Sequence, residues 1–386
     1  MYESGHTKNR KKICIVSTVP YVLRWFMTPH IILLSKSYDV SLITNGSAMD
    51  LANLINDKVS LIPLEIERKV SPIKDIKTLI QLTKILKTNK FDCVHSIMPK
   101  SGLLAMVAGK LAAIPLRFHT FTGQVWANRT GIKRFFLKLF DKLLVLSSTH
   151  VFADSNSQRL FLINNGIVTA KKIEVLADGS ISGVNINRFQ FSTLKRTKIR
   201  QELNIPTDAV VYLFLGRLNI DKGIADLLTA FLNIVSNNNN YHLLIVGPNE
   251  DDFEKEFAKL NAKHSENLHR VGFTDKPEDY MSASDIFCMP SYREGFGSVI
   301  IEAATIGIPA IASKIYGITD AIEDGITGIL HKPKNIQEIT SAMLKLGSNL
   351  ELRAKLGTAA KKRAETRFPE ERLANAMRSF YENNLN

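Results

Sequence analysis

Residues 293–303 have the sequence Arg293-Glu294-Gly295-Phe296-Gly297-Ser298-Val299-Ile300-Ile301-Glu302-Ala303. This stretch places two carboxylates, Glu294 and Glu302, eight positions apart. A Gly-Phe-Gly turn lies between them and leads into an apolar segment. A glycine-rich turn that opens a helix offers backbone N–H groups and a partial positive charge, which together suit a phosphate. The stretch therefore predicts a phosphate-binding turn followed by a helix.

A second segment upstream, Gly216-Arg217-Leu218-Asn219-Ile220-Asp221-Lys222-Gly223, follows the apolar run 210–215. Its glycines allow close approach of the backbone to a ligand. Arg217 offers a planar fork of donors and Lys222 offers a point charge. The alternative is an ordinary surface loop with two solvated cations. The strand before the loop and the glycines at both ends favour a diphosphate site, with the carboxylates of Glu294 and Glu302 beside it to hold the hydroxyls of a sugar and a ribose.

Strand-like runs alternate with helical patterns throughout the chain, which indicates a parallel α/β architecture. Two doubly wound domains that face each other across a cleft are expected, because 386 residues exceed one ordinary core. Ligands bind beyond the carboxyl ends of the strands in such sheets. The predicted strands are 13–17, 39–43, 93–96, 116–119 and 150–153, then 210–215, 242–246, 268–271, 286–289 and 310–312.

The chain is expected to divide into an N-terminal domain, residues 1–185, and a C-terminal domain, residues 186–366. The irregular segment Asp178-Gly179-Ser180-Ile181-Ser182-Gly183 marks the boundary. Pro369 opens a last helical pattern that ends near Leu385, within a final segment 367–386.

Charge is distributed unevenly along the chain. Residues 1–185 carry 25 Lys and Arg against 12 Asp and Glu, which accounts for the whole net charge of +13. This asymmetry favours an anionic partner for the first half, although a solvated surface without a partner is the alternative. No run of about 18 apolar residues predicts a membrane span, and the polar segment Met1 to Lys12 is not typical of a secretory signal. Cys14, Cys93 and Cys288 lie in apolar runs and are expected to be buried free thiols.

The two segments, together with Phe118-His119-Thr120-Phe121-Thr122-Gly123-Gln124-Val125-Trp126, resemble the retaining glycosyltransferases of family 4, which have the GT-B fold. The third segment is similar to bacterial enzymes that build capsule and O-antigen repeat units on a lipid diphosphate carrier. The resemblance implies metal-independent transfer of a hexosyl or N-acetylhexosaminyl group without a cofactor. The implied donor is a nucleotide-diphosphate sugar, expected to be UDP-linked, and the implied acceptor is a polyprenyl-diphosphate-linked glycan.

The resemblance implies that the domain 1–185 binds the acceptor, that the domain 186–366 binds the nucleotide-sugar donor, and that the helix within 367–386 crosses back onto the N-terminal domain. It also implies roles for individual residues. Glu302 would bind the ribose, and Glu294 would reach toward the donor sugar or cap its helix. His119, which ends a predicted strand, would lie across the cleft from the donor sugar, although a structural histidine is the alternative. The implied catalytic residues are His119, Arg217, Lys222 and Glu294, and the implied donor-binding residues are Gly216, Arg217, Lys222, Phe273, Thr274, Glu294, Gly295, Phe296, Gly297, Ser298, Val299 and Glu302.

Two further features concern the acceptor and the membrane. The bulky segment 17–26 replaces the Gly-Gly loop of many family members, and its Arg24 is a candidate for contact with a lipid diphosphate. Residues 131–145 predict an amphipathic helix with an apolar stripe. That helix either faces the core or lies on anionic lipid, with four cations around the stripe: Lys133, Arg134, Lys138 and Lys142. The expected location is the cytoplasm, at the inner face of the cytoplasmic membrane.

Competing functions remain open at this point. The same fold could act on a soluble acceptor or as a nucleotide-sugar epimerase, and a catalytically silent nucleotide-binding protein is a third reading. No Cys/His cluster suggests zinc, and no metal site is expected. Beyond net charge, no basic and aromatic pattern predicts nucleic-acid binding.

Overall fold

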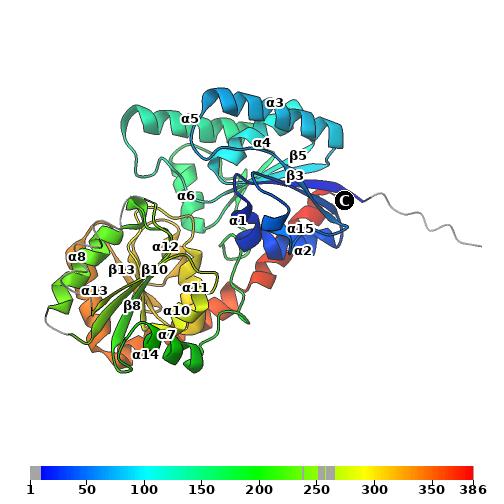
Figure 1. Ribbon diagram of the computed structural model, residues 1–386. Coiled ribbons are helices and arrows are strands. Elements are labelled where there is room, and N and C mark those ends of the chain that lie inside the picture. Colours follow the sequence, from blue (N-terminus) through cyan, green and yellow to red (C-terminus); the bar gives the residue numbers. More distant parts are fainter. Residues whose placement is uncertain (1–9, 237–238, 251–256, 258–265, 386) are drawn as a thin grey trace, which may run out of the picture. The chain divides into compact units, whose positions relative to one another are not determined.

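The computed structural model describes residues 10–236, 239–250, 257 and 266–385. The chain divides into two compact units (Figure 1). Unit 1 contains the residues up to Ser182 and those from Glu371 onward, and unit 2 contains residues 183–370. Each unit is a parallel sheet covered by helices on both faces, as the alternating pattern predicts.

The sheet of unit 1 has seven parallel strands in the order β3-β2-β1-β4-β5-β6-β7. Its central strands are rich in Val and Ile and are buried on both faces, which is typical of parallel sheets. The strands are β1 (Lys12–Val16), β2 (Asp39–Thr44), β3 (Val59–Pro63), β4 (Cys93–Ile97), β5 (Leu116–Phe121), β6 (His150–Ala153) and β7 (Ile173–Glu174).

Two apolar cores lie on the two faces of this sheet. One core contains side chains of α3, α4, α5 and α6, and the other contains side chains of η1, α2 and α15. The helices are α1 (Pro20–Val22), a π-helical turn η1 (Leu23–Met27), α2 (Thr28–Ser35), η2 (Met49–Leu51), α3 (Pro72–Asn89), α4 (Pro99–Leu111), α5 (Gly131–Ser147) and α6 (Asn156–Asn164).

The last helix, α15 (Glu370–Leu385), packs on unit 1 although it follows unit 2 in the sequence. The hydroxyl of Tyr381 lies 2.8 Å from Nδ1 of His95, whose Nε2 lies 2.8 Å from Oγ1 of Thr120. The ring of Tyr381 also meets Phe118 edge to face. These contacts fix α15 against β4 and β5, which confirms the crossover helix expected for this fold.

The sheet of unit 2 has six parallel strands in the order β10-β9-β8-β11-β12-β13. All six strands run the same way, so the loops at their carboxyl ends leave the same edge of the sheet. The strands are β8 (Val210–Leu215), β9 (Tyr241–Val246), β10 (Leu268–Val271), β11 (Ile286–Met289), β12 (Ala310–Ser313) and β13 (Gly328–His331).

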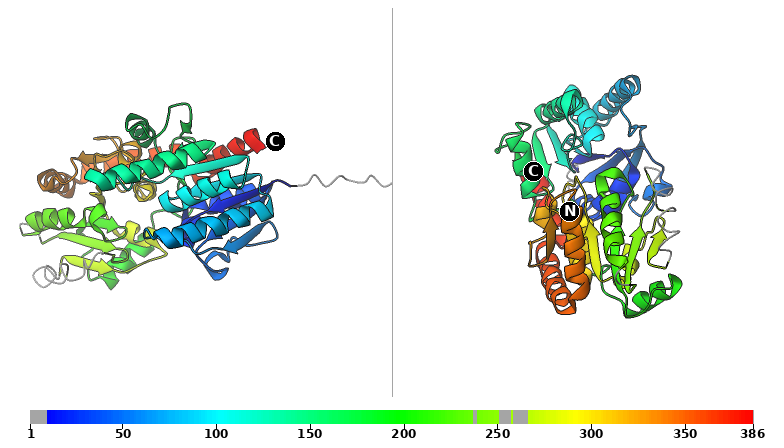
Figure 2. Two further views of the ribbon diagram at one scale, coloured as in Figure 1. Left: turned by 90° about the horizontal axis from the view of Figure 1, so that it is seen from above. Right: turned by 90° about the vertical axis from the view of Figure 1, so that its left-hand side faces the viewer.

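Helices also form two layers in unit 2. Helices α8 and α13 cover one face of the sheet, and α10, α11 and α12 cover the other (Figures 1 and 2). Their side chains belong to two separate apolar cores. The helices are α7 (Thr193–Glu202), the 3-10 turn η3 (Ile220–Lys222), α8 (Ile224–Val235), α10 (Pro277–Ala283), α11 (Ser298–Ile306), α12 (Ile318–Ala321), α13 (Ile336–Ser348) and α14 (Leu350–Arg367).

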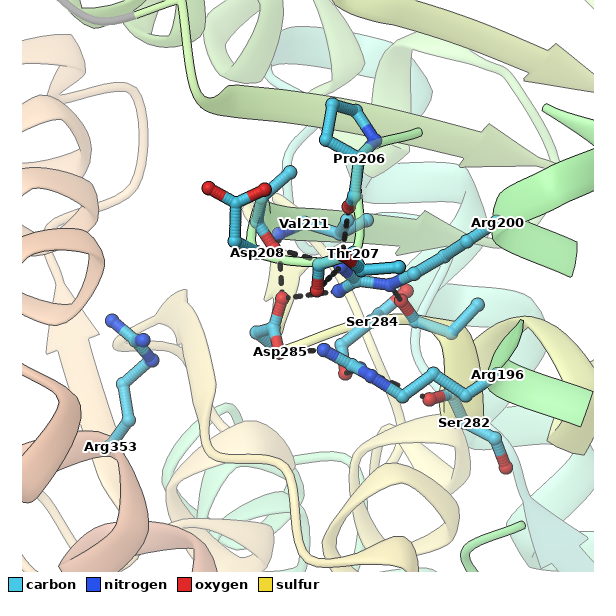
Figure 3. Close-up of polar contacts among 12 residues, drawn as sticks. Arg196, Arg200, Pro206, Thr207, Asp208, Val211, Ser282, Ser284, Asp285 and Arg353 are labelled. Atoms are coloured by element: carbon cyan, nitrogen blue, oxygen red, sulfur yellow. Dashed lines mark hydrogen bonds and ion pairs between the residues drawn. The ribbon is translucent and has the colours of Figure 1, made fainter. Parts of the chain in front are cut away.

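A buried arginine joins α7 to the amino-terminal edge of this sheet (Figure 3). Arg200 is 2% exposed and donates to four backbone carbonyls and to Oδ2 of Asp285, at 2.8 Å. Asp285 also accepts from Arg196 and from the backbone N–H of Val211. Arg196 and Arg200 therefore share one carboxylate, and the network joins α7 to the end of the sheet opposite the carboxyl-end loops.

Candidate active site

The loop between β8 and α8 contains the two predicted phosphate-binding cations. Lys222 ends η3, and Gly223 then adopts a left-handed conformation with φ +66° before α8 begins. A side chain at Gly223 would collide with the backbone carbonyl of Pro290 in the loop after β11. Glycine is therefore required here both for its backbone angles and for the close approach of the two loops.

Tyr292 and the first two residues of the downstream stretch contact the upstream loop or the helix α8 that follows it. The hydroxyl of Tyr292 donates to Oδ2 of Asp226 at 2.7 Å. Arg293 lies 2.9 Å from Oδ2 of Asp221, and Nζ of Lys222 lies 2.5 Å from Oε1 of Glu294. The backbone N–H of Tyr292 also donates to the carbonyl of Asp221 at 2.8 Å. The two predicted segments thus form one connected site at the carboxyl edge of the sheet.

The second cation of the loop, Arg217, has a different partner. Its guanidinium lies 2.8 Å from Oε2 of Glu250, which follows β9 and also accepts from Asn219 at 2.9 Å. Arg217 and Glu250 are both partly exposed, so their pairing contributes little to stability. Glu250 was not predicted from sequence, although β9 neighbours β8 in the sheet and their loops leave the same edge.

Helix α11 begins at Ser298, directly after the glycine-rich turn, as predicted. Gly297 has φ +84° and no side chain caps the first turn of the helix. Phe296 is buried and its ring meets Phe368 at 5.2 Å, which fixes the turn to the core. Helix α11 begins shortly after Glu294 and Gly295, and Val299 lies in its first turn. The amino-terminal end of this helix presents a partial positive charge.

Glu302 lies in α11 among buried Ile301, Ala303 and Ala304. Its side chain is partly buried, and it accepts no hydrogen bond from the described residues. Burial raises the pKa of Glu302 to about 7, while Arg188 opposes this rise and Glu278 adds to it. An ionised Glu302 can accept hydrogen bonds from a ligand, and a ribose diol has two donors.

Phe273 and Thr274 follow β10, whose carboxyl end lies at the same edge of the sheet as those of β8 and β9. The side chain of Phe273 is 71% exposed. Oγ1 of Thr274 accepts from the backbone N–H of Lys276 at 3.0 Å. The exposed ring is free to contact a ligand, and the role of these two residues in donor binding remains a prediction.

A first prediction concerns the pH dependence of nucleotide binding. The ionised form of Glu302 is the better acceptor for ribose hydroxyls, and with a pKa near 7 it forms as the pH rises from 6 to 8. We expect the Kd for UDP to fall by up to about tenfold over that range. Glu302→Gln should weaken UDP binding and remove most of this pH dependence in calorimetry. An unchanged Kd in Glu302→Gln would refute the ribose role.

The raised pKa of Glu302 also affects the stability of the folded protein. The folded pKa of Glu302 lies above its ordinary value of 4.5, so the folded state holds more protons between about pH 4.5 and 7. The ligand-free protein should therefore lose stability as the pH rises through that window. Glu302→Gln should lessen this loss, which thermal melts at pH 5 and pH 8 measure.

A second prediction concerns the pair Asp221–Arg293, in which both side chains are less than one-third exposed. Because the pair joins the two loops, either Asp221→Asn or Arg293→Gln should weaken UDP binding about fivefold. The double variant should resemble each single one, since the same contact is lost. Additive losses in Kd would show that the two side chains act separately.

His119 lies inside β5, which continues to Phe121, and not at a strand end as predicted. Its ring is fully buried on the sheet face that α4 and α5 cover, with Nδ1 2.9 Å from Oγ of Ser96. A side chain at Gly102 of α4 would collide with this ring. Burial lowers the pKa of His119 to about 3, so the imidazole is neutral at pH 7. The structure thus gives His119 a position in the core, and its catalytic role remains a prediction.

The predicted acceptor and membrane residues lie on the surface of unit 1. Arg24 is exposed in η1, with its guanidinium 5.4 Å from the centre of the Trp25 ring. In α5, Lys133 and Lys142 are exposed. Arg134 and Lys138 are instead partly buried over the ring of Trp126, at 5.6 and 5.3 Å. The expectation that all four cations surround a lipid-facing stripe is therefore corrected: two of them pack against the protein.

The apolar stripe of α5 does not face the core. Its side chains are 41–69% exposed, while the inner face of the helix consists of Asp141, Leu144, Val145 and Ser147. Asp141 accepts a hydrogen bond of 2.7 Å from Nε1 of Trp126. The exposed stripe consists of Ile132, Phe135, Phe136, Leu139, Phe140, Leu143 and Leu146.

Within residues 10–236, 239–250, 257 and 266–385, no group of three or more His, Cys, Asp or Glu side chains is arranged to hold a metal ion. Across the same ranges, no helix is long and apolar enough to cross a bilayer. The three cysteines are buried free thiols, as expected.

Two family profiles match the chain. The profile of "Glycosyl transferases group 1" matches residues 195–363, and that of "Glycosyl transferase 4-like domain" matches residues 33–179. The chain belongs to the family 4 glycosyltransferases and is a glycosyltransferase with the GT-B fold.

Similar proteins act on lipid-linked glycans or belong to capsule synthesis. "Capsular polysaccharide biosynthesis glycosyltransferase CapM" of Staphylococcus aureus is 28% identical over 90% of each chain. The Escherichia coli "UDP-Gal:alpha-D-GlcNAc-diphosphoundecaprenol alpha-1,3-galactosyltransferase" is 28% identical over 88% of this chain and 89% of that protein.

Among solved structures, Anabaena Alr3699/HepE in complex with UDP has a TM-score of 0.79 at 17% identity, covering 97% of this chain and 100% of that one. Sucrose-phosphate synthase from Thermosynechococcus elongatus has a TM-score of 0.80 at 20% identity, covering 97% and 99%. At these identities the likeness concerns the fold alone.

Proposed function

We propose that this glycosyltransferase moves a sugar from a UDP-linked donor to a polyprenyl-diphosphate-linked glycan, with retention of configuration, in the synthesis of a bacterial capsule or O-antigen. The carrying observation is the connected site of unit 2, in which Lys222 and Glu294 lie 2.5 Å apart at the carboxyl edge of the sheet. The names of the Staphylococcus and Escherichia relatives support the pathway and the acceptor, and the UDP-linked donor in the name of the Escherichia relative supports the base.

The residues suggest how the donor is activated. In this proposal Arg217 and Lys222 bind the diphosphate, and Arg217 exchanges Glu250 for a phosphate oxygen. The amino-terminal end of α11 adds its partial charge. Preorganised cations stabilise the charge that grows on the departing diphosphate, so a metal ion is not needed for that task. Glu302 holds the ribose, and Glu294 reaches the donor sugar.

The transfer step follows from this arrangement. The acceptor hydroxyl attacks the anomeric carbon on the face that the diphosphate leaves, which retains configuration. The C–O bond to the diphosphate breaks as the new glycosidic bond forms. A phosphate oxygen of the leaving group takes the hydroxyl proton, so no protein carboxylate acts as the base.

We also propose that the protein attaches peripherally to the inner face of the cytoplasmic membrane through α5. Seven apolar side chains in one exposed row exceed what a solvated helix surface usually carries. Lys133 and Lys142 flank this row, and the net charge of the first 185 residues is +13. Apolar insertion and attraction to anionic lipid would act together at this surface.

A panel of nucleotides and nucleotide sugars tests the donor assignment. Thermal melts should show a rise in Tm with UDP and with at least one UDP-sugar, because a ligand at 100 times its Kd adds about 2.7 kcal/mol. ADP and GDP at the same concentrations are the matched controls. A rise with GDP or ADP but none with UDP would overturn the UDP assignment, and no rise with any nucleotide would overturn the donor site. Transfer to a soluble acceptor without any lipid requirement would favour the alternative enzyme class.

A further inference from the structure

Three loops at the carboxyl edge of the unit 1 sheet meet around Asp154, which directly follows β6. The backbone N–H of Asp154 donates to Oε1 of Gln158 at 2.7 Å, and its carbonyl accepts from the N–H of Ser180 at 2.6 Å. Gln158 also donates to Oε1 of Gln124, in the loop after β5, at 3.4 Å. All four residues are at most 6% exposed. The backbone of Asp154 is therefore held by Gln158 of α6 and by Ser180, which follows β7, and Gln158 connects it to the loop after β5.

The backbone N–H and carbonyl of Asp154 are hydrogen-bonded, whereas its carboxylate is not hydrogen-bonded to any described residue. Asp154 is 4% exposed, Oδ1 is buried, and no described residue donates a hydrogen bond to this carboxylate or forms an ion pair with it. Burial raises the pKa of Asp154 well above that of an ordinary carboxyl group. Asp141, which is also buried in unit 1, instead accepts a hydrogen bond from Trp126. Leaving a buried carboxylate without donors is costly unless a ligand provides them.

Backbone strain occurs beside the same carboxylate. Ser180, whose N–H contacts Asp154, has φ +74°, and Ala177 in the same loop has φ +50°. Neither residue is glycine, so these left-handed conformations cost free energy that the surrounding structure must offset. Such strain is typical of ligand-binding loops, and ligands of parallel sheets bind at this edge.

The chemistry of Asp154 restricts the ligand. Hydrogen bonds from a ligand favour the ionised form of Asp154 over the neutral acid that burial favours. Because that carboxylate repels a phosphate, this position does not suit the diphosphate of a lipid carrier. It suits a neutral group with hydrogen-bond donors, and sugar hydroxyls or an acetamido N–H are such groups. The nearby amides of Gln124 and Gln158 are also typical of sugar-binding sites, because each amide has both donors and an acceptor.

We propose that Asp154 binds the terminal sugar of the acceptor by accepting hydrogen bonds from its hydroxyl or acetamido groups, and thereby orients the attacking hydroxyl. The proposal rests on the glycosyltransferase function above and assigns the sugar-binding part of the acceptor site to unit 1. Asp154 acts here as a substrate-binding residue that sets acceptor specificity, while the donor site of unit 2 is independent of it.

The test compares Asp154→Asn with the wild type. Asparagine keeps the shape of the side chain but removes the charge, so kcat/KM for the acceptor should fall about 30-fold, as expected when a hydrogen bond to a charged group is lost. The Kd for UDP should not change, and Tm should stay equal or rise because an unpaired buried carboxylate is removed. Asp92→Asn, at the amino-terminal edge of the same sheet, is the matched control.

Two measurements test the proposal, one of sugar transfer and one of sugar binding. The first is transfer from a UDP-sugar to a short-chain polyprenyl-diphosphate N-acetylglucosamine. The second is saturation-transfer NMR with the methyl glycoside of N-acetylglucosamine in the presence of UDP, which needs no turnover. Loss of the sugar signal in Asp154→Asn with UDP binding intact supports the proposal. Equal sugar signals or equal kcat/KM values in the wild type and Asp154→Asn would overturn it. The absence of a sugar signal in the wild type would also overturn it, as would a fall in the Tm of Asp154→Asn together with weaker UDP binding. Failure of the wild type to bind UDP would instead contradict the proposed function.

Discussion

Lys222→Gln should lower the rate of sugar transfer by about 100-fold or more, because a preorganised charge on the leaving diphosphate is lost. Nζ of Lys222 lies 2.5 Å from Glu294, and the two side chains are 17% and 13% exposed. Glutamine can still donate a hydrogen bond to Glu294, so the variant removes the charge without leaving that carboxylate without a donor. Rates at saturating donor and acceptor concentrations measure the effect on the chemical step.

A control separates catalysis from stability in this experiment. Lys345→Gln changes an exposed lysine on α13 of the same unit and should leave the rate unchanged. Because the Lys222–Glu294 pair is mostly buried, Lys222→Gln should lower Tm somewhat, and melts must show that the variant is folded at the assay temperature. A folded Lys222→Gln protein with full activity would refute the diphosphate role of Lys222.

Replacement of Phe135, Phe136 and Phe140 by Gln should reduce binding to anionic vesicles by at least about 100-fold. These side chains are 61%, 49% and 41% exposed on α5. Burial of a Phe side chain in an apolar phase contributes about 1.5–3 kcal/mol, and the three act together. Gln favours helix formation, so the helix should persist. Sedimentation with vesicles of defined composition measures the partition constant.

The charge contribution needs its own variant. Lys133→Ser with Lys142→Ser should weaken binding to anionic vesicles by roughly tenfold or more at low salt, since each cation near such a surface contributes about 1 kcal/mol. This loss should shrink as salt rises, because exposed charges are screened. Arg134 and Lys138 are left unchanged because they pack over Trp126. If the triple Phe variant bound as the wild type does, α5 would not be the membrane-binding surface.

The sequence predicted the parallel strands whose apolar runs are long and β-branched, such as β8 and β9. It missed β3, β7 and β13 for physical reasons. β3 and β13 lie at the edges of their sheets, where one side of the strand lacks a neighbour and a mixed composition is tolerated. β3 also ends in Pro63, and β7 has two residues. Such short or interrupted strands form because a neighbouring strand is already present, which local sequence does not reveal.

The candidate site was predicted in its parts but not in its connections. Glycine-rich turns and cations are visible in sequence, so Lys222 and Glu294 could be named. The pairing of Arg293 with Asp221, and of Arg217 with Glu250, depends on strand order and loop conformation. Asp221 and Arg293 both lie within the two segments quoted from the sequence. Their opposite charges were the feature of the sequence from which this pairing could have been predicted.

One question that the sequence left open and one wrong prediction have the same origin. The apolar periodicity of α5 left its outward or inward orientation open, because a stripe of this kind also forms core-facing helices. His119 was placed at a strand end, whereas hydrogen bonds to β4 and β6 extend β5 by two residues and bury the ring. Tertiary contacts determine both the orientation of α5 and the position of His119, and the local sequence does not reveal these contacts.

The central claim is that the connected site of unit 2 transfers sugar from a UDP-sugar to a lipid-linked glycan. Its most direct test is the movement of radiolabel from UDP-sugars into a short-chain polyprenyl-diphosphate N-acetylglucosamine held in anionic vesicles. We predict that wild-type protein transfers label from at least one UDP-sugar into the lipid fraction without added metal, and that Lys222→Gln does so about 100-fold more slowly. Wild-type protein that binds UDP but transfers no label to the lipid from any UDP-sugar would contradict the claim.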